Sequence, residues 1–410
     1  LQEIARVKRV LELLGGDPNF RAECLGPGSD PVAAARRRGL QLDPRAIRPF
    51  WFAGQGSSAE GPSRLWKAWR EFRSPSWAGE LPAGPVEVYR RWWARQRERC
   101  RLELGTSVND EIVHYSSAIE LSSGCSVACW FCGVSAGRLK GFFPWNKSNA
   151  ALWRETLGEL GRVLGSALDR SALYWATDPS DNPDYERFAE DFHRLTGRVP
   201  QATTAAPLRD PSWTRGVLAL RRRDPALFER FSILTIEELR GVHREYSPDE
   251  MLLVELVLQN KGAWRPSKAL AGRALNAAPK PGKFGRNSGE INTRQATIAC
   301  VTGFLINLQE RTAQLISPCR ASTERPLGYR VYERVELLRP GDLSAFIDRC
   351  LKRFSVRPED VGVIRFHRDA RYQPAREGFS LSTDSCTRRF KGDEGLKAIG
   401  DAIATGSFNR

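Results

Sequence analysis

The sequence has no long apolar run: no stretch approaches the roughly 20 consecutive apolar residues of a membrane-spanning helix. Cysteine is also scarce, at nine of 410 residues. That number is too low for a disulfide-stabilised scaffold, and it favours a reducing, cytoplasmic location. Residues 1–16 predict an amphipathic helix rather than a signal peptide. We therefore expect a globular cytoplasmic protein that does not bind membranes.

The charge is strongly unbalanced, with 63 Lys and Arg against 48 Asp and Glu, a formal net charge of +15. Such an excess favours an anionic partner, either a nucleic acid or an acidic polypeptide. An arginine-rich composition imposed by a high-GC genome would give the same excess without a functional cause. The basic residues are scattered rather than gathered in a tail, so charge alone does not choose between these readings.

Helix signals predict a small helical unit over residues 1–48. Asp17 before Pro18, and Ser29 or Asp30 before a second proline, are typical helix starts, because the side-chain oxygen caps free N–H groups. Residues 49–109 predict a connector. It is irregular and rich in Trp, Pro, Gly and Ser up to residue 82, and it ends in a basic helix at 85–104.

From residue 110 short apolar runs alternate with amphipathic helices, which indicates βαβ units and a parallel sheet. About six units fit between residues 112 and 319, fewer than the eight of a closed barrel. The expected strands lie at 111–124, 172–179, 199–207, 230–238, 295–307 and 312–319. The expected helices lie at 148–168, 183–197, 211–223 and 247–260. An α/β domain over 110–332 is therefore expected, followed by an α+β extension over 333–410.

Three of the nine cysteines, Cys125, Cys129 and Cys132, crowd into the segment CSVACWFC. A structural zinc site usually has four ligands in two pairs. Here no fourth cysteine follows within the next hundred residues, and His114 could join only by folding back along its own strand. Three thiolates with one open position instead suit a [4Fe–4S] cluster in which one iron binds another ligand. The segment follows the first expected strand, where barrel-type sheets place active-site loops.

The spacing C-x₃-C-x₂-C, with Phe131 before the last cysteine, resembles the signature of the radical S-adenosylmethionine (SAM) enzymes. This resemblance implies a partial (β/α)₆ barrel and a [4Fe–4S] cluster held by the three cysteines. It also implies that SAM chelates the open iron and is cleaved to a 5′-deoxyadenosyl radical, which abstracts a hydrogen atom from substrate. The six units counted from the residues agree with this fold.

The same resemblance implies further SAM contacts. Asp178, in the segment WATDPSDNPDY, is the candidate for the SAM amino group, although the glycines usual in the family are missing there. An aspartate that caps the turn before Pro179 is the alternative. Polar residues at strand ends are candidates for the SAM carboxylate or ribose, although such residues are common for structural reasons. They are Thr203, Thr204, Ser232 and Thr235.

Over roughly residues 110–335, longer sequence segments resemble the proteusin-type radical SAM peptide epimerases. These segments are ELSSGCSVACWFCG, YWATDPSDNPDY, TIACVTGFLINLQERTAQLISPC and PLGYRVYE. The resemblance implies conversion of L- to D-residues in a ribosomally made precursor peptide, with an electron donor such as flavodoxin or ferredoxin. Residues 1–48 also resemble leader peptides of the nitrogen-fixation-associated class. A basic surface would attract an acidic leader, and loop 276–294, with Lys280, Lys283 and Arg286, is a candidate for part of it.

An epimerase must return a hydrogen atom to the substrate radical, and a cysteine thiol suits this role because its S–H bond is weak. Cys319 is the first candidate, because it ends the last expected strand where the SAM site is expected. Cys386, in the tail, is the second. The other cysteines are less suited: Cys24 and Cys100 precede the barrel, and Cys300 and Cys350 are expected to be buried.

Three alternatives stay open. A radical SAM maturase that crosslinks peptides needs no donor cysteine, but it often has further cluster motifs, which this tail lacks. A radical SAM enzyme acting on RNA is favoured by charge alone, and the sequence shows no recognisable RNA-binding module. A zinc-binding interaction protein would contain no iron and would not cleave SAM.

Overall fold

The computed structural model describes residues 1–50, 62–73, 81, 84–110, 112–264, 271–277, 299–355, 362–383 and 387–408. The loop candidates Lys280, Lys283 and Arg286 lie outside these residues, as does the donor candidate Cys386. No helix within the described ranges combines the length and apolar character needed to cross a membrane.

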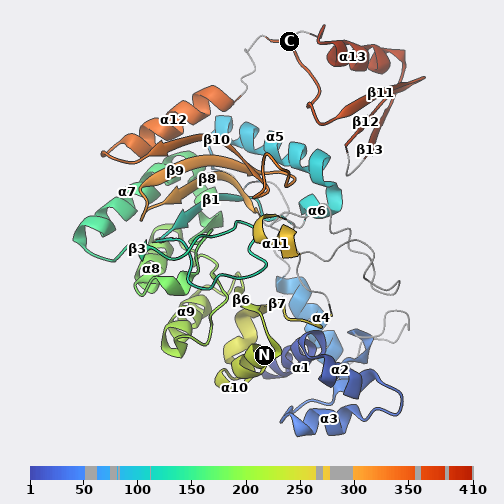
Figure 1. Ribbon diagram of the computed structural model, residues 1–410, viewed down its shortest axis with the longest axis vertical. Coiled ribbons are helices and arrows are strands. Elements are labelled where there is room, and N and C mark those ends of the chain that lie inside the picture. Colours follow the sequence, from blue (N-terminus) through green and yellow to red (C-terminus); the bar gives the residue numbers. More distant parts are fainter. Residues whose placement is uncertain are drawn as a thin grey trace.

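Six parallel strands form the centre of the described protein (Figure 1). β1 (Tyr115–Glu120) pairs with β4 (Ser171–Ala172) on one side and with β8 (Val301–Asn307) on the other. Beyond β4 the sheet continues through an isolated parallel β-bridge between Ala172 and Gln201. It connects to a second parallel group of β5 (Thr203–Thr204), β6 (Glu229–Ile233) and β7 (Val254–Leu258). The α/β class is therefore confirmed, while the partial barrel stays a prediction.

Two further strands continue the sheet beyond β8 in the opposite direction. β9 (Thr312–Pro318) pairs antiparallel with β8, and β10 (Tyr329–Glu336) pairs antiparallel with β9. The predicted strand at 312–319 is thus confirmed as a strand. It does not belong to a further βα unit, however, because a tight hairpin connects it to β8 without a helix between them.

The sheet curls around one face, which we call the inner face and define by the buried cluster of Tyr115, Ala118, Val301 and Leu305. Trp175, just after β4, and Tyr329, in β10, have ring centroids 5.8 Å apart. Three strands separate β4 from β10. A flat sheet would hold those two about 19 Å apart, because neighbouring strands are about 4.8 Å apart. The contact therefore indicates that the sheet curves toward its inner face.

Helices cover the opposite, outer face of the sheet (Figure 1). Their apolar sides bury residues such as Trp153, Phe188 and Phe346 against Phe304 of β8. Each such side chain stabilises the fold by about 2–3 kcal/mol. The covering helices are α5 (Glu87–Leu104), α7 (Lys147–Leu164), α8 (Tyr185–Thr196), α9 (Pro211–Arg223) and α12 (Asp342–Phe354).

The helix predicted at 247–260 is wrong. Ser247 does begin a helical turn, since its hydroxyl accepts the Glu250 N–H at 3.2 Å, but the helix ends after the short 3₁₀ segment η5 (Glu250–Leu253). The following residues form β7, which extends the parallel group beside β6. A helix does occur just before this segment: α10 (Ile236–Glu245), which is capped by Thr235. Because α10 begins at Ile236, the strand predicted to reach residue 238 ends earlier. Sheet pairing and burial outweigh the helical periodicity of this segment.

The N-terminal residues form the predicted helical unit, with α1 (Gln2–Gly16), α2 (Pro18–Leu25), α3 (Pro31–Arg37) and η1 (Pro44–Phe50). Asp17 and Asp30 cap α2 and α3 as expected. α1 buries Val7 and Val10 in one cluster with Leu239 of α10 and Val254 of β7. Residues 49–82 are not wholly irregular, because they include α4 (Pro62–Arg73).

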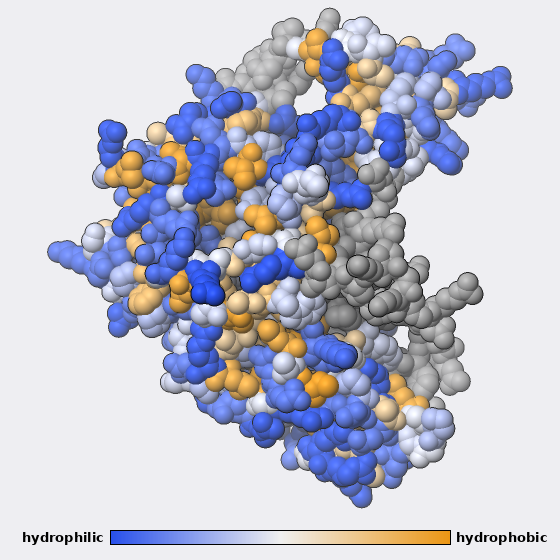
Figure 2. All heavy atoms as spheres, in the orientation of Figure 1, coloured by the Kyte–Doolittle hydropathy of each residue, from blue (hydrophilic) through white to orange (hydrophobic). Residues whose placement is uncertain are grey.

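The C-terminal extension contains a three-stranded antiparallel sheet of β11 (Arg371–Ala375), β12 (Gly378–Ser382) and β13 (Thr387–Lys391), with α13 (Glu394–Thr405) against it. It projects from the body at the top of Figure 1. Hydrophilic residues cover most of the face drawn in Figure 2, with hydrophobic residues scattered among them. The short elements that remain are α6 (Thr106–Asp110), β2 (Ser122–Ser123), β3 (Gly141–Phe142), η3 (Gly165–Arg170), η4 (Pro179–Asp181) and α11 (Gly272–Ala277).

Candidate functional site

The three clustered cysteines lie on one loop, which leaves the carboxyl end of β1 and returns at β3. β2 and β3 pair antiparallel and close the base of this cysteine loop. Gly124 has φ +76°, and a Cβ there would lie 2.1 Å from the carbonyl oxygen of Arg138. Only glycine allows this turn and this close approach. The backbone N–H of Cys125 then donates to the Gly137 carbonyl at 2.9 Å.

Cys125, Cys129 and Cys132 are all free thiols and partly exposed. Burial raises the pKa of Cys129 to about 12, with further contributions from the thiols of Cys125 and Cys132 and the carboxylate of Asp178. The three sulfurs are therefore close enough to oppose one another's ionisation, which a bound cation would relieve. The Ala136 N–H donates to Cys132 Sγ at 3.3 Å, and hydrogen bonds to sulfur are one means of tuning Fe–S clusters. This donor set fits an iron–sulfur cluster with three protein ligands.

A buried carboxylate holds the cysteine loop from one side. Asp181 accepts the Ser126 N–H at 2.9 Å and also the Ser126 hydroxyl. Arg209 reaches both partners, Asp181 at 2.8 Å and the Ser126 hydroxyl at 2.6 Å. The Asp181 side chain is fully buried, and Ser126 follows Cys125 directly. This Asp181–Arg209 clamp connects the cysteine loop to the loops after β4 and β5.

α11 supports the loop from a second side. The Arg273 N–H donates to the Cys132 carbonyl at 2.9 Å. Gly272 has φ +54°, and a Cβ there would lie 2.5 Å from the Gly133 carbonyl oxygen and 2.8 Å from that of Cys132. A side chain at Gly272 would therefore push the loop away.

The aromatic residues of the motif lie at the end of this loop. Phe131 stacks edge-on against Trp130, with ring centroids 5.5 Å apart. Trp130 is 48% exposed, which is unusual for tryptophan and makes its ring accessible. A contact between Phe131 and SAM stays a prediction.

Asp178 caps the turn that begins at Pro179, which was the alternative role considered for it. Its Oδ1 accepts the Ser180 N–H at 3.0 Å and the Thr204 hydroxyl at 2.8 Å. Its Oδ2 accepts the Ala205 N–H at 2.7 Å. Asp178 is buried, and these bonds engage both oxygens in joining the loop after β4 to the end of β5. The proposed contact with the SAM amino group stays a prediction.

The other strand-end candidates also have structural partners. Thr203 donates to the Tyr174 hydroxyl at 2.7 Å, and Thr204 donates to Asp178. Thr235 caps α10 by accepting the Glu238 N–H at 3.0 Å. Ser232 is buried within β6. The structure thus brings Thr203 and Thr204 together with Asp178. Thr235 instead caps the first turn of α10.

Cys319 is not where the sequence placed it. Because β9 runs antiparallel to β8, the end of β9 lies beside the amino end of β1, not beside its carboxyl end, where the cysteine loop begins. Cys319 is buried, and its pKa is raised to about 11 by burial and by Glu103 of α5. Its thiol thus belongs to the α5 side of the sheet. The expectation that Cys319 stands at the SAM end is wrong.

Cys300 lies at the same end of the sheet as Cys319, because it directly precedes β8, which runs parallel to β1, and its carbonyl accepts the Tyr115 N–H at 2.7 Å. It differs from Cys319 in the face to which it belongs. It is partly exposed, whereas Cys24, Cys100, Cys319 and Cys350 are buried. Cys300 packs against the inner-face cluster, as do Tyr174, Trp175 and Tyr329. Burial raises the pKa of Cys300, so it carries S–H at neutral pH. Among the described thiols outside the motif, Cys300 is the one that packs against the inner-face cluster, and it also packs against the cluster of Cys100, Leu104 and Ile112.

Glu120 ends β1 and is a site residue that the sequence analysis missed. It is buried, and it accepts the Ala176 N–H at 2.7 Å and the Asn307 side-chain N–H at 3.1 Å. Burial raises the pKa of Glu120 to about 7. A carboxyl group that is half protonated near neutral pH at the carboxyl end of the central strand is a candidate functional group. The sequence offered one signal for Glu120, namely its position at the end of the first expected strand.

Comparisons with known proteins give one strong match. The chain is 36% identical to the uncharacterized protein y4wI of Sinorhizobium fredii over 422 aligned residues, which cover 99% of this chain and 81% of that protein. A solved structure of BtrN in complex with AdoMet and 2-DOIA matches with a TM-score of 0.26 and 17% identity, over 35% of this chain and 56% of that chain. At that score the match carries no argument about fold or activity. No family model matches. The chain belongs to the same family as the Sinorhizobium fredii protein y4wI.

Proposed function

We propose that the protein is a radical SAM enzyme. The observation that carries this proposal is the cysteine loop, with three free, partly exposed thiols at C-x₃-C-x₂-C spacing directly after β1. The Asp181–Arg209 clamp and α11 hold this loop from two sides. Three thiolates leave one position of a four-iron cluster open, whereas a structural zinc site needs a fourth ligand.

Cys125, Cys129 and Cys132 would hold the cluster, and its open iron would bind SAM. When bound, the cluster and SAM supply a 5′-deoxyadenosyl radical that removes a hydrogen atom from the substrate. The protein contributes position and protection from water, because a radical reaction depends on close contact between the reacting atoms.

The inner face is the proposed substrate surface. Trp175 and Tyr329 meet across it, and their rings provide apolar walls for substrate side chains. Glu120 lies at the end of the central strand, where its carboxyl group can accept a hydrogen bond from a substrate N–H. A curved face with aromatic walls and a polar end suits a peptide segment.

The reaction we propose is L-to-D epimerisation in a ribosomally made peptide, with Cys300 as the hydrogen donor because its thiol packs against the inner face. This role requires the modified Cα to lie deep on the inner face, toward the amino ends of β1 and β8. After abstraction from Cα, the S–H of Cys300 returns a hydrogen atom to the opposite side of the planar Cα radical. The S–H bond breaks, a C–H bond forms, and a thiyl radical stays on Cys300. One electron from a flavodoxin or ferredoxin and one proton from solvent then restore the thiol.

The test is co-expression with the nearby-encoded precursor in D₂O, followed by mass spectrometry of the peptide. We expect a gain of one mass unit for each modified residue, and that residue should be D after hydrolysis. Cys300→Ala should abolish deuterium uptake while SAM cleavage continues, and Cys319→Ala should retain both. A loss of two mass units would instead indicate a crosslink or desaturation and would contradict epimerisation. Deuterium uptake by Cys300→Ala would move the donor elsewhere, with Cys386 next to be tested.

A further inference from the structure

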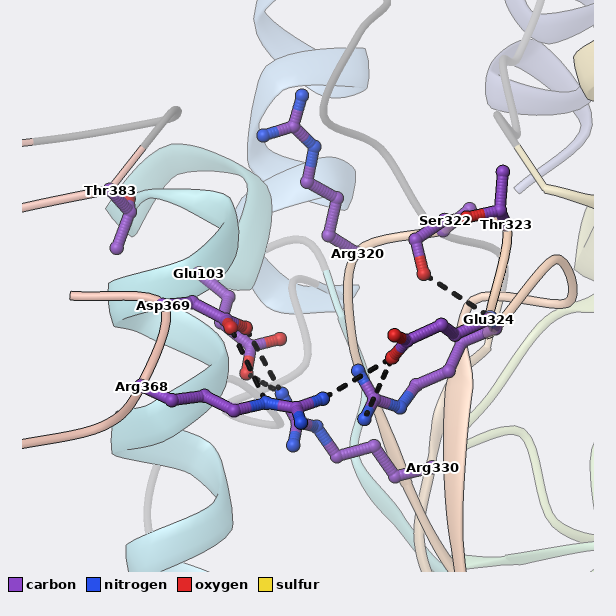
Figure 3. A pocket seen from close by; sticks show the side chains of 11 residues that line it. Glu103, Arg320, Ser322, Thr323, Glu324, Arg330, Arg368, Asp369 and Thr383 are labelled. Carbon is purple, nitrogen blue, oxygen red and sulfur yellow. Dashed lines mark hydrogen bonds and ion pairs between the residues drawn. The ribbon is translucent and has the colours of Figure 1, made fainter.

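A cavity of about 490 Å³ lies between the carboxyl end of α5, the β9–β10 loop and the C-terminal segment around residue 368 (Figure 3). Its wall contains three hydroxyl side chains, three carboxylates and one alanine. It also contains four arginines, Arg320, Arg325, Arg330 and Arg368. We call this cavity the arginine pocket. It lies apart from the cysteine loop, and the radical chemistry does not use it.

Paired charges fill the inner part of the pocket. Arg330 is largely buried and contacts Glu103 at 2.5 Å, while Arg99 contacts the same carboxylate at 2.7 Å. Arg330 also lies 3.5 Å from Asp369, so these two guanidinium groups face two carboxylates. The positive excess comes from the lining as a whole, in which four arginines face three carboxylates. The Nε of Arg330 is also buried and has no hydrogen-bond partner among the described residues.

The outer part of the pocket already holds a carboxylate from the protein itself. The Glu324 side chain lies 3.3 Å from Arg368 and 3.8 Å from Arg325. Figure 3 shows the side chains of Glu324 and Arg368 pointing toward each other. The side chains of Glu324 and Arg368 are 70% and 62% exposed. Exposed ion pairs contribute little to stability, so another carboxylate can readily replace Glu324. Glu324 therefore marks where a ligand carboxylate fits.

The lining of the pocket excludes two other classes of ligand. Among the residues that the structure describes, the lining has no aromatic side chain on which a nucleobase could stack. Glu103, His367 and Asp369 bring possible metal-ligand atoms within 4.8 Å of one another, yet Arg99 and Arg330 already occupy Glu103. Adjacent guanidinium groups oppose a cation.

We propose that the arginine pocket binds a segment of an acidic peptide. One carboxylate of that segment replaces Glu324 between Arg325 and Arg368, and another reaches toward Arg330. Because the arginines stand at two depths, the ligand needs more than one carboxylate, as adjacent Asp or Glu residues in an extended peptide provide. Charge-assisted hydrogen bonds of this kind are short and strong. The proposal does not depend on the radical chemistry.

The test measures binding of a labelled hexaglutamate peptide to the full chain by fluorescence anisotropy at low salt. Arg368→Gln should weaken binding about tenfold, the loss expected for one charge-assisted contact. Glu324→Gln should strengthen it about threefold, because the competing carboxylate is gone. The matched controls come from the exposed pair of Arg223 and Glu190, 3.2 Å apart on α9 and α8. Arg223→Gln and Glu190→Gln change the net charge equally and should each change the affinity less than twofold.

Two outcomes would overturn the proposal. If both pocket variants match their controls, the peptide binds only to the general positive charge of the surface. If a hexauridylate RNA binds as tightly and loses affinity equally in Arg368→Gln, the site is a general oxyanion site rather than a peptide site. A hexaglutamine peptide should not bind, and tight binding of it would exclude carboxylate recognition.

Discussion

Replacement of Glu120 by glutamine removes a buried titrating group from the end of the central strand. The glutamine keeps the size of the side chain and one accepted hydrogen bond, either from Ala176 or from Asn307. Asn307 cannot turn its amide to suit the new side chain, because its oxygen already accepts the Glu310 N–H at 2.8 Å. The lost hydrogen bond by itself should therefore lower the unfolding free energy of Glu120→Gln by about 1 kcal/mol, independently of pH. The ionisation of Glu120 in the wild type adds a pH-dependent difference to it.

The pH dependence follows from the raised pKa of Glu120. In the folded chain this pKa is about 7, against 4.5 for an unperturbed glutamate. Between these values the unfolded chain releases the proton while the folded chain keeps it, so the wild type loses stability as pH rises. One pKa unit corresponds to about 1.4 kcal/mol, so the whole shift costs the wild type up to about 3 kcal/mol above pH 7. Below pH 4.5 the cost vanishes.

The assay is urea unfolding of the metal-free chain under reductant, followed by tryptophan fluorescence from pH 4.5 to 8. Glu120→Gln should be less stable than the wild type at pH 4.5 and more stable at pH 8. Glu155→Gln, an exposed change on α7, should stay within about 0.5 kcal/mol of the wild type throughout. A constant difference between Glu120→Gln and the wild type would refute the argument that Glu120 is desolvated at the end of the sheet.

Two further predictions concern the cysteine loop. Arg209→Gln leaves the buried Asp181 without its cation, which should lower the unfolding free energy by about 2 kcal/mol. It should also reduce the iron bound after anaerobic reconstitution. Normal iron content would show that the Asp181–Arg209 clamp does not position the loop. Gly272→Ala adds a Cβ against the loop carbonyls and should lower both Tm and iron content. Gly39→Ala, with φ +66° and open space around it, should lower Tm slightly and leave iron unchanged, and equal iron loss in both variants would contradict a specific contact at Gly272.

Local signals predicted the parts of the fold that depend on neighbouring residues. The caps at Asp17 and Asp30 and the alternation of strands and helices are visible in the chain itself. Strand direction is not, because it depends on which strands pair. That is why the strand ending near Cys319 was given the wrong orientation, and why the segment at 254–258 was taken for helix.

The candidate site shows the same division. The spacing of the three cysteines marked them as candidate cluster ligands, because ligands from one loop must be close in sequence. Asp181 and Arg209 act through contacts with Ser126, which lies 55 and 83 residues away, so no local pattern could reveal them. Cys300 was dismissed because an apolar strand suggests burial. In the structure Cys300 stands just before β8 and is partly exposed, packed against the inner-face cluster.

The most direct test of the central claim is anaerobic reconstitution of the wild type and Cys129→Ala, with measurement of iron, sulfide and 5′-deoxyadenosine formed from SAM and dithionite. Our account predicts about four iron and four sulfide per wild-type chain, as one [4Fe–4S] cluster requires, together with 5′-deoxyadenosine. Cys129→Ala should bind little iron and sulfide and should form little 5′-deoxyadenosine. Stoichiometric zinc without iron, or undiminished 5′-deoxyadenosine from Cys129→Ala, would contradict it.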